Sequence, residues 1–270
     1  MRPVVLSIAG LDPGGGAGIV ADVKTIEAHG CWAAAVATTL TVQTTARVGD
    51  LHAVPPRLLR AQIAAVFADH AVAAVKIGML GGAPSVAAVA RALRGCKVPL
   101  VLDPVCTATS GRRFLDERAL ARLRAELLPI VHVLTPNREE AGWLAGLPPS
   151  ASARDAANKL RGLGVRHVLI TGGTTRHGVC EDRLFSADGV HAIAHRAIVT
   201  DRLHGTGCLH SSSVAARLAQ GESVLAAATG AGRWLEQTLE HGVAFGGGGS
   251  PDASWRGAVR PDVAARGHAP

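Results

Sequence analysis

The segment His204-Gly205-Thr206-Gly207-Cys208 carries the strongest chemical signal in the sequence. A Gly-Thr-Gly turn that opens a helix aligns backbone N–H groups that have no acceptor inside the helix, and such turns bind anions. Cys208 stands just inside the predicted helix start, where the pKa of a thiol is lowered and a thiolate can act. This combination suits phosphoryl transfer. A tight turn followed by a buried cysteine is the alternative interpretation.

A glycine-rich stretch, Gly10–Gly18, follows the apolar run Val4–Ile8. Glycines let the backbone approach a ligand closely and adopt positive φ. The stretch has neither the Gly-Lys-Thr ending of a P-loop nor the spacing of a dinucleotide fingerprint. Asp12 lies in this stretch, and Asp22, four residues into the next predicted helix, can face the same cleft. A turn without a ligand and a solvated carboxylate near a helix start are the alternatives.

Two further side chains suit a flat heteroaromatic ligand. Gln43, in the run Thr41–Thr45 after a predicted strand, can donate and accept a hydrogen bond at once, as a ring nitrogen with a neighbouring amine requires. Met79 follows the run Val72–Ile77 and can pack on a flat ring. An ordinary turn glutamine and a core methionine are the alternatives.

Three side chains with oxygen atoms suit magnesium. Asp103 follows the apolar run Val98–Leu102 and is fixed by the next residue, a proline. Asn137 and Glu140 are three residues apart at a predicted helix start, so both can face one hydrated ion. The alternative is a capping box with Asn137 as the N-cap residue and Glu140 as its partner, and the local sequence favours that alternative.

The composition narrows the possible functions. The chain has 270 residues, of which 48% are hydrophobic and 18% charged, so it is not a disordered chain. Aromatic residues make up only 3% and tyrosine is absent, which argues against stacking of nucleic-acid bases. The net charge is +7, but the basic residues are scattered, so we expect attraction of small anions and no nucleic-acid partner.

The five cysteines are odd in number and include no C-x-x-C pair, so their spacing indicates neither a disulfide framework nor a zinc site. No signal-peptide pattern opens the chain, and no segment of about 18 or more apolar residues occurs. We therefore expect a reduced, cytoplasmic protein without a membrane partner.

Short β-branched runs alternate with segments rich in alanine and leucine. The predicted strands are Val4–Ile8, Ala33–Thr39, Val72–Ile77, Val98–Leu102, Val131–Leu134, His167–Ile170, Val179–Leu184 and Val190–His195. The predicted helices are Gly18–His29, Pro56–Asp69, Pro84–Leu93, Glu117–Leu127, Glu139–Leu144, Ala153–Leu163, Gly207–Ala219 and Val224–Leu239. Because the strands are apolar runs, the pattern predicts an α/β fold, a three-layer αβα sandwich with a mostly parallel central sheet. Ligands of such sheets bind beyond the carboxyl ends of the strands, where each candidate residue falls.

The stretch Gly246–Pro251 predicts a flexible break. We expect one domain over residues 1–244 and a flexible tail rich in glycine and arginine over residues 245–270. A last piece of packed structure around Trp255 is the alternative.

The chain resembles the hydroxymethylpyrimidine/phosphomethylpyrimidine kinases, a branch of the ribokinase-like fold. Five motifs carry the resemblance, in order, over roughly residues 4–240. They are Ile8–Ile19 with Ala21–Thr25, Lys76–Leu80, Asp103–Val105 with Ser110-Gly111, Thr135–Ala141 and His204–Cys208.

The resemblance implies MgATP-dependent phosphorylation of 4-amino-5-hydroxymethyl-2-methylpyrimidine, and then of its monophosphate, for thiamine biosynthesis. It also implies a homodimer. The pyrimidine pocket would be lined by Gly10, Asp12, Asp22, Gln43 and Met79. The anion hole would consist of Gly205, Thr206 and Gly207, with Cys208 as the base. Magnesium would be held by Asp103, Asn137 and Glu140, and the nucleotide by Asn137, Thr171, Gly173 and Gly207.

The chain departs from the family pattern at Thr109 and Thr171, where many members have lysines that can approach phosphates. Compensation by an arginine is a hypothesis, and its candidates are Arg112, Arg113 and Arg176. Three alternatives stay open: a pyridoxal or pyridoxine kinase, a sugar or nucleoside kinase, and a catalytically weak pyrimidine-binding regulatory protein.

Overall fold

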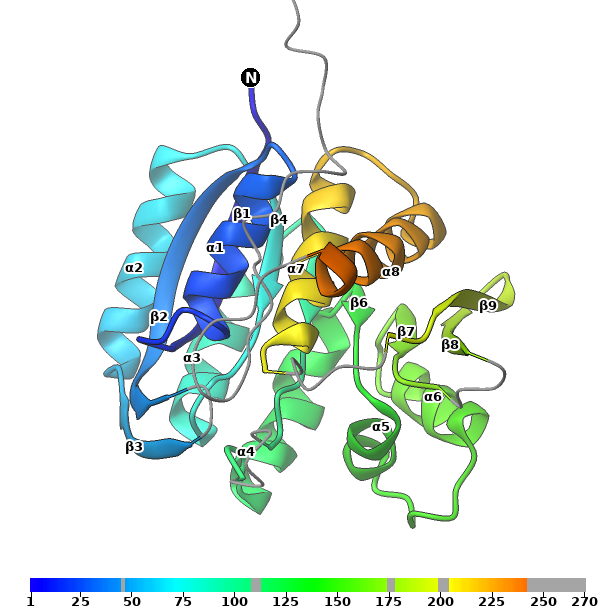
Figure 1. The fold of residues 1–270 in the computed structure, drawn as a ribbon. Helices are drawn as coiled ribbons and strands as arrows, with labels where there is room; N and C mark the ends of the chain where they lie inside the picture. Colours follow the sequence, from blue (N-terminus) through cyan, green and yellow to red (C-terminus); the bar gives the residue numbers. More distant parts are fainter. Residues whose placement is uncertain (45–46, 108–112, 174–177, 199–203, 242–270) are drawn as a thin grey trace, which may run out of the picture.

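The computed structural model describes residues 1–44, 47–107, 113–173, 178–198 and 204–241. Within them, nine strands form one sheet in the order β3-β2-β1-β4-β5-β6-β7-β8-β9. The strands are β1 Val4–Leu11, β2 Trp32–Gln43, β3 Val48–Ala53, β4 Val72–Ile77, β5 Leu100–Leu102, β6 Val133–Leu134, β7 His167–Ile170, β8 Val179–Ser186 and β9 Gly189–Arg196. The six central strands, β2-β1-β4-β5-β6-β7 in sheet order, pair in parallel. The antiparallel strands lie at the two edges, with β3 at one edge and β8 and β9 at the other (Figure 1).

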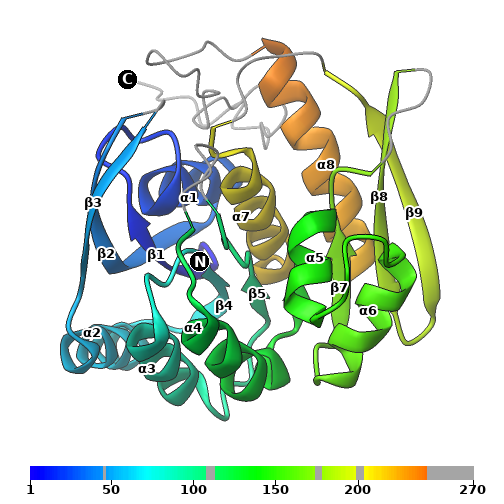
Figure 2. The same cartoon turned by 90° about the horizontal axis from the view of Figure 1, so that it is seen from below.

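Helices cover both faces of the sheet (Figure 2). The helices are α1 Gly18–Ala28, α2 Pro56–Asp69, α3 Ala83–Leu93, α4 Glu117–Arg122, α5 Arg138–Ala145, α6 Ala153–Gly162, α7 Thr206–Ala219 and α8 Val224–His241. A π turn, Leu123–Leu127, and a 3₁₀ turn, Leu128–Ile130, continue α4. One layer holds α1, α7 and α8, and the other holds α2 to α6. The predicted three-layer αβα sandwich with a mostly parallel sheet is therefore confirmed.

Successive side chains of a strand point alternately toward the two helical layers, so the central strands are apolar on both sides. On β1, Leu6 and Ile8 pack toward α2 and α3, whereas Val5 packs toward α7. Burial at these positions is complete. The alternation fixes the register of β1 between β2 and β4, and this register places the end of β1 beside the ends of its neighbours.

Sequence reasoning missed the edge strand β3. Its sequence, Val-Gly-Asp-Leu-His-Ala, contains few strand-forming residues and lies mostly exposed. It pairs antiparallel with the second half of β2, which runs to Gln43 rather than ending at Thr39 as predicted. Gln43 is therefore the last residue of a strand and does not belong to the turn that follows it.

The predicted tail, residues 245–270 with Trp255, lies outside the described residues, and so do Thr109, Arg112 and Arg176. No helix in the described part of the chain is both long and apolar enough to span a bilayer.

Candidate active site

A cavity of about 690 Å³ opens at the carboxyl ends of the parallel strands. Each of six strands contributes a residue at or just after its end, in the position expected for α/β ligand sites. These residues are Leu11 of β1, Gln43 of β2, Met79 after β4, Asp103 after β5, Thr135 after β6 and Thr171 after β7. The start of α7 also lines the cavity, next to the glycine-rich loop.

Asp12 joins the two glycine-containing loops. Its carboxylate accepts hydrogen bonds from the amides of Gly14 (2.8 Å) and Ala17 (2.9 Å), and Oδ2 lies 3.0 Å from Nε2 of His204. Burial alone would raise the pKa of Asp12, but the hydrogen bonds from His204 and the two amides outweigh burial and lower it. Asp12 therefore lines the cavity as an ionised carboxylate, and its hydrogen bonds hold the two loops together.

Gly205 touches the glycine-rich loop so closely that only glycine fits. Its φ is +84°, and a Cβ atom there would lie 1.9 Å from the carbonyl oxygen of Gly16. A side chain would be strained at this φ and would also force the two backbones apart. The Gly-Thr-Gly turn and the glycine-rich loop thus form one wall of the cavity.

The amides at the start of α7 have the arrangement expected of an anion hole. Gly205 is the N-cap residue, and no side chain of the described residues caps the helix. The first helical hydrogen bond runs from Leu209 N to Gly205 O (3.0 Å), so the amides before Leu209 point out of the helix end. Gly205, Thr206 and Gly207 all line the cavity, as expected.

Cys208 lines the same cavity, but the predicted lowering of its pKa is wrong. Burial, together with the nearby carboxylates of Asp103 and Asp22, raises the pKa of the thiol to about 12. The ammonium of Lys76 and the amide of Gly18 act in the opposite direction without prevailing. The helix-start argument fails because it counts the helix dipole and omits the burial of the thiol and the carboxylates that other elements bring close.

Asp22 does not line the cavity, contrary to its predicted place in the pyrimidine pocket. Asp22 is fully buried, and its Oδ1 lies 2.8 Å from Nζ of Lys76. The hydroxyls of Ser7 (2.6 Å) and Ser212 (2.8 Å) donate to the same carboxylate. Asp22 is therefore the centre of a buried polar network that ties α1 to β1, β4 and α7.

Lys76 is a site residue that sequence reasoning overlooked, although its motif was noted. Burial by itself would lower the pKa of this lysine, but the carboxylates of Asp22 and Asp103 raise it, so the side chain stays cationic. The sequence signal was a lysine inside the otherwise apolar strand Val72–Ile77. A charge in a strand covered on both faces requires a buried partner.

Asp103 stands next to the anion hole. A Cβ on Gly207 would lie 3.7 Å from Asp103 Oδ2, and that oxygen accepts a hydrogen bond from Ser211 of α7 (3.1 Å). Burial raises the pKa of Asp103, and the negative charge of Asp22 adds to this effect. A buried carboxylate beside an anion-binding turn indicates a position for a cation between them.

Asn137 and Glu140 form the capping box that the local sequence favoured. Glu140 N donates to Asn137 Oδ1 (2.9 Å), and Asn137 N donates to Glu140 Oε2 (3.0 Å). Both side chains also line the cavity. Burial, followed by the charge of Asp103, raises the pKa of Glu140 to about 7. The buried carboxylate of Asp103 and the half-buried one of Glu140 destabilise each other, which suits a divalent cation, so these residues fit Mg²⁺.

One end of the cavity contains the residues that were expected to bind a flat ring. A Cβ on Gly10 would lie 2.2 Å from Met79 Cε, so the methionine covers this glycine. Thr41 Oγ1 donates to Leu11 O (2.7 Å) and lies 3.3 Å from Gln43 Oε1. Gly10, Gln43 and Met79 are thus brought together on the cavity wall, as expected.

At the other end, Thr171 lines the cavity beside Asn137, with which it forms a parallel bridge. Gly173 does not line it, contrary to expectation: a Cβ there would lie 1.8 Å from the carbonyl oxygen of Glu181, so the residue packs against β8. Gly172 lines the cavity in its place. Arg113, one of the candidates for compensating a missing lysine, does not line the cavity, and its guanidinium lies over the ring of Trp143 at 5.3 Å.

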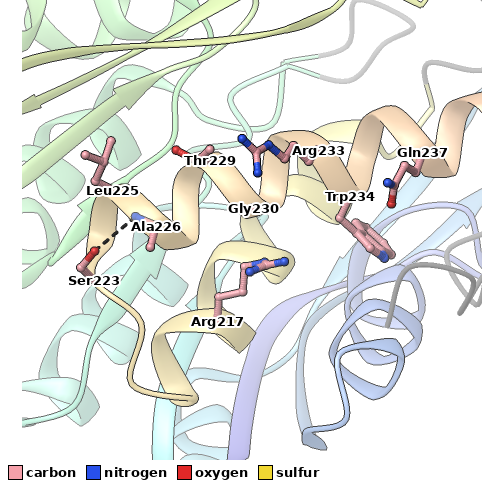
Figure 3. A pocket seen from close by; sticks show the side chains of 9 residues that line it. All are labelled: Arg217, Ser223, Leu225, Ala226, Thr229, Gly230, Arg233, Trp234 and Gln237. Atoms are coloured by element: carbon pink, nitrogen blue, oxygen red, sulfur yellow. Dashed lines mark hydrogen bonds between the residues drawn. The ribbon is translucent and has the colours of Figure 1, made fainter. Parts of the chain in front are cut away.

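A second cavity, of about 600 Å³, lies between α7 and α8 away from the strand ends (Figure 3). None of the sequence-predicted site residues lines it. Two of its polar residues make contacts at the turn between the helices: Arg217 pairs with Glu222 (2.7 Å), and Ser223 accepts from Ala226 N at the start of α8 (3.3 Å).

Solved structures place the fold among the ribokinase-like vitamin kinases. An ADP complex of Bacillus subtilis pyridoxal kinase superposes with a TM-score of 0.84 at 27% sequence identity, covering 94% of this chain and 98% of that one. The sequence model of the family described as phosphomethylpyrimidine kinase matches residues 12–252. The chain belongs to the phosphomethylpyrimidine kinase family.

Relatives agree with this membership. The hydroxymethylpyrimidine/phosphomethylpyrimidine kinase of Haemophilus influenzae is 38% identical over 258 residues, which cover 93% of this chain and 96% of that protein. The thiamine biosynthesis bifunctional protein ThiED of Geobacter sulfurreducens is 38% identical over 253 residues, which cover 93% of this chain. The match spans 52% of that bifunctional relative, about half of its length.

Proposed function

We propose that this protein transfers a phosphoryl group from ATP to the hydroxymethyl group of 4-amino-5-hydroxymethyl-2-methylpyrimidine, and a second one to the resulting monophosphate. The enzyme is a phosphotransferase of thiamine biosynthesis. The observation that carries the proposal is the anion hole of α7 facing Asp103 in a cavity whose other end holds Gln43 and Met79. Family membership and the named kinases among the relatives support it.

The anion hole is assigned to the transferred phosphoryl group. Phosphoryl transfer depends on positioning and charge neutralisation more than on covalent chemistry. Thr206 and Gly207 line the cavity and precede Leu209, which donates the first hydrogen bond of α7, so negative charge would be stabilised at this helix start. A preorganised donor of this kind contributes on the order of 3 kcal/mol to the transition state.

Cys208 is assigned to receive the proton of the attacking hydroxyl. Its thiol is held protonated at neutral pH by burial and by the charges of Asp103 and Asp22. A cation bound to Asp103 would cancel one of the negative charges that raise the pKa of the thiol, and the ammonium of Lys76 stabilises the thiolate. The resting thiol first releases its own proton to solvent. The thiolate then takes the proton of the attacking hydroxyl as the new O–P bond forms and the bond between the transferred phosphorus and ADP breaks.

Asp103 and Glu140 would hold magnesium, with Asn137 beside them, mostly through water. Bound there, Mg²⁺ would supply positive charge next to the transferred group. Thr171 and Gly172 would lie along the nucleotide. Two arginines, Arg47 and Arg196, line the described part of the cavity. Arg196 already pairs with Glu236 (3.1 Å) and Glu240, so Arg47 is the candidate for the role of the absent lysines.

A pyridoxal kinase is the second candidate, because the superposed Bacillus subtilis structure is one. The discriminating feature is Gln43, whose amide can pair with a ring nitrogen and an amino group of a pyrimidine. Pyridoxal carries an aldehyde in place of that amine, so the pair of hydrogen bonds is lost.

The protein acts as a homodimer in the cytoplasm, with the catalytic domain over residues 1–244. The dimer is supported by exposed apolar side chains along β2, where Leu40 is 50% and Val42 is 62% exposed. Exposed apolar side chains of this kind mark association surfaces. Sedimentation of the wild type and of Val42→Glu tests this: a dimer that the variant dissociates supports the face, and a wild-type monomer at micromolar concentration overturns it.

The substrate assignment is tested by ADP release with MgATP and four acceptors: hydroxymethylpyrimidine, its monophosphate, pyridoxine and ribose. Turnover on the first two compounds alone is the expected result. Turnover mainly on pyridoxine would move the protein to the second candidate. Binding of hydroxymethylpyrimidine without any turnover would make the protein a regulatory binder.

A further inference from the structure

Three metal-binding side chains meet on the wall of the cavity formed by β8 and β9. Cys180 and Asp182 are two residues apart on β8, so their side chains leave the same face. His195 of β9 stands directly opposite Cys180 in the ladder. The thiol sulfur, a carboxylate oxygen and a ring nitrogen of these residues all lie within 4.8 Å of one another.

Each of the three side chains is already oriented by its surroundings. Asp182 is 4% exposed, and its Oδ1 accepts from Gly172 N (3.0 Å) while Oδ2 lies 3.3 Å from His195 Nε2. The thiol of Cys180 contacts Gly173 O at 3.6 Å. The amide of Gly172 orients the Asp182 carboxylate from outside the cluster, and outer contacts of this kind raise the affinity of a metal site. The other two contacts would give way to the metal.

An independent observation comes from α7. His210 is 5% exposed, and its Nε2 has no hydrogen-bond partner among the residues that the structure describes. The ring lines the same cavity and interacts electrostatically with Asp182 and His195. A buried imidazole nitrogen without a partner costs stability unless something else binds it.

We propose that Cys180, Asp182 and His195 bind one divalent transition-metal ion of the Zn²⁺ class, with His210 supplying the fourth ligand. A thiolate, imidazoles and a carboxylate are the ligands that zinc prefers, in contrast to the oxygen-only set of Asp103 and Glu140. Tetrahedral coordination places ligand atoms about 3.5 Å apart, so the three clustered ligands need a modest contraction. His210 lies outside that cluster and must move closer to join them. Binding releases the thiol proton of Cys180 to solvent.

The proposal extends beyond phosphoryl transfer, since the site is separate from the magnesium carboxylates. The spacing of the cysteines gave no sign of it because the ligands come from β8, β9 and α7. The test therefore measures metal binding alone, without nucleotide or acceptor, and a failure of the proposed kinase activity would leave its result unchanged.

Titration of the metal-free protein with Co²⁺ provides the measurement. We expect one equivalent of Co²⁺ to give the near-ultraviolet sulfur-to-cobalt charge-transfer band of a thiolate ligand, and Zn²⁺ to abolish it. Cys180→Ser should lose the band, and His195→Gln should weaken binding. Cys96→Ser, a change of a half-buried thiol elsewhere, should retain it. Unfolding curves of each variant show whether the protein is folded.

The absence of the band in the wild type would overturn the proposal. So would a band that persists in Cys180→Ser, or one that is lost in Cys208→Ser, because the thiol at the start of α7 would then be the ligand.

Discussion

The ammonium of Lys76 and the carboxylate of Asp22 lie 2.8 Å apart, both fully buried under the first turn of α7. Residues 54 positions apart in the chain are thus joined directly beneath Cys208. The pair balances a buried cation and anion and, through Ser212, ties the catalytic helix to the sheet. The electrostatics of the thiol depend on both partners.

Removing one partner of this pair leaves an uncompensated buried charge. We expect Lys76→Met and Asp22→Asn each to lower the free energy of unfolding by about 3–5 kcal/mol. Urea unfolding followed by circular dichroism measures the change. The double variant Lys76→Met/Asp22→Asn should be less destabilised than the sum of the single ones. Additive losses would show that the two side chains are not coupled.

Gly205→Ala should disrupt the site, because its Cβ would meet Gly16 O at 1.9 Å. If the turn shifts by about 1 Å to relieve this clash, turnover should fall by about 10²-fold. Gly221→Ala is the matched control: Gly221 has a similar φ, +88°, and nothing within 4 Å of a Cβ. The control should lose about 1–2 kcal/mol of stability and keep its turnover. Equal turnover in both variants would contradict the close contact of the loops.

Gly10→Ala should change the ring-binding end selectively. The added methyl group would push Met79 into the cavity, since the Cβ position lies 2.2 Å from its Cε. The KM for the pyrimidine should rise while the KM for ATP stays unchanged. Gly142→Ala in α5, where a Cβ meets nothing within 4 Å, is the control. A rise in the KM for ATP instead would place the ring elsewhere.

The stability of the fold should fall in acid through His29. Burial, with help from Arg217, lowers the pKa of this histidine from 6.5 to about 4. The unfolded chain therefore binds a proton between these two values that the folded chain does not bind. The contribution of His29 to the free energy of unfolding is complete above about pH 6.5 and falls by about 3 kcal/mol as the pH drops to 4.

Unfolding curves of His29→Gln between these pH values check that prediction. The variant should show a flatter pH dependence than the wild type, whereas His52→Gln, on the exposed strand β3, should match the wild type. A wild-type stability that is constant across the same range would refute the assignment.

The kinase reaction should accelerate with pH. Because the pKa of Cys208 is raised to about 12, the thiolate fraction grows at every pH below that value. With MgATP saturating, kcat/KM for the pyrimidine should rise from about pH 6 to 9 without levelling. A plateau above pH 7 would show that a different group, with a lower pKa, accepts the proton.

The central architecture could be predicted from the sequence because the central parallel strands are largely apolar runs that alternate with helices. Val72–Ile77 and His167–Ile170 were predicted with their observed bounds. The edge strand β3 could not be found in the same way, because Val48–Ala53 is stabilised by pairing with β2 rather than by burial of an apolar pattern.

At the site, sequence position alone placed the residues that directly follow strands, such as Asp103. It failed for Asp22 and for the pKa of Cys208, since both depend on which side chains other elements bring close. Gly173 was also misplaced by one residue, because its role is set by the backbone of β8.

The most direct test is ADP formation from MgATP and hydroxymethylpyrimidine by the wild type and by Cys208→Ala, with pyrimidine affinity measured by calorimetry in parallel. The account predicts acceptor-dependent turnover in the wild type and a loss of about 10²–10⁴-fold in the variant, with affinity changed only a few-fold. Wild-type turnover in Cys208→Ala would contradict the assignment of the base, and a wild type without acceptor-dependent ADP formation would contradict the proposed activity itself.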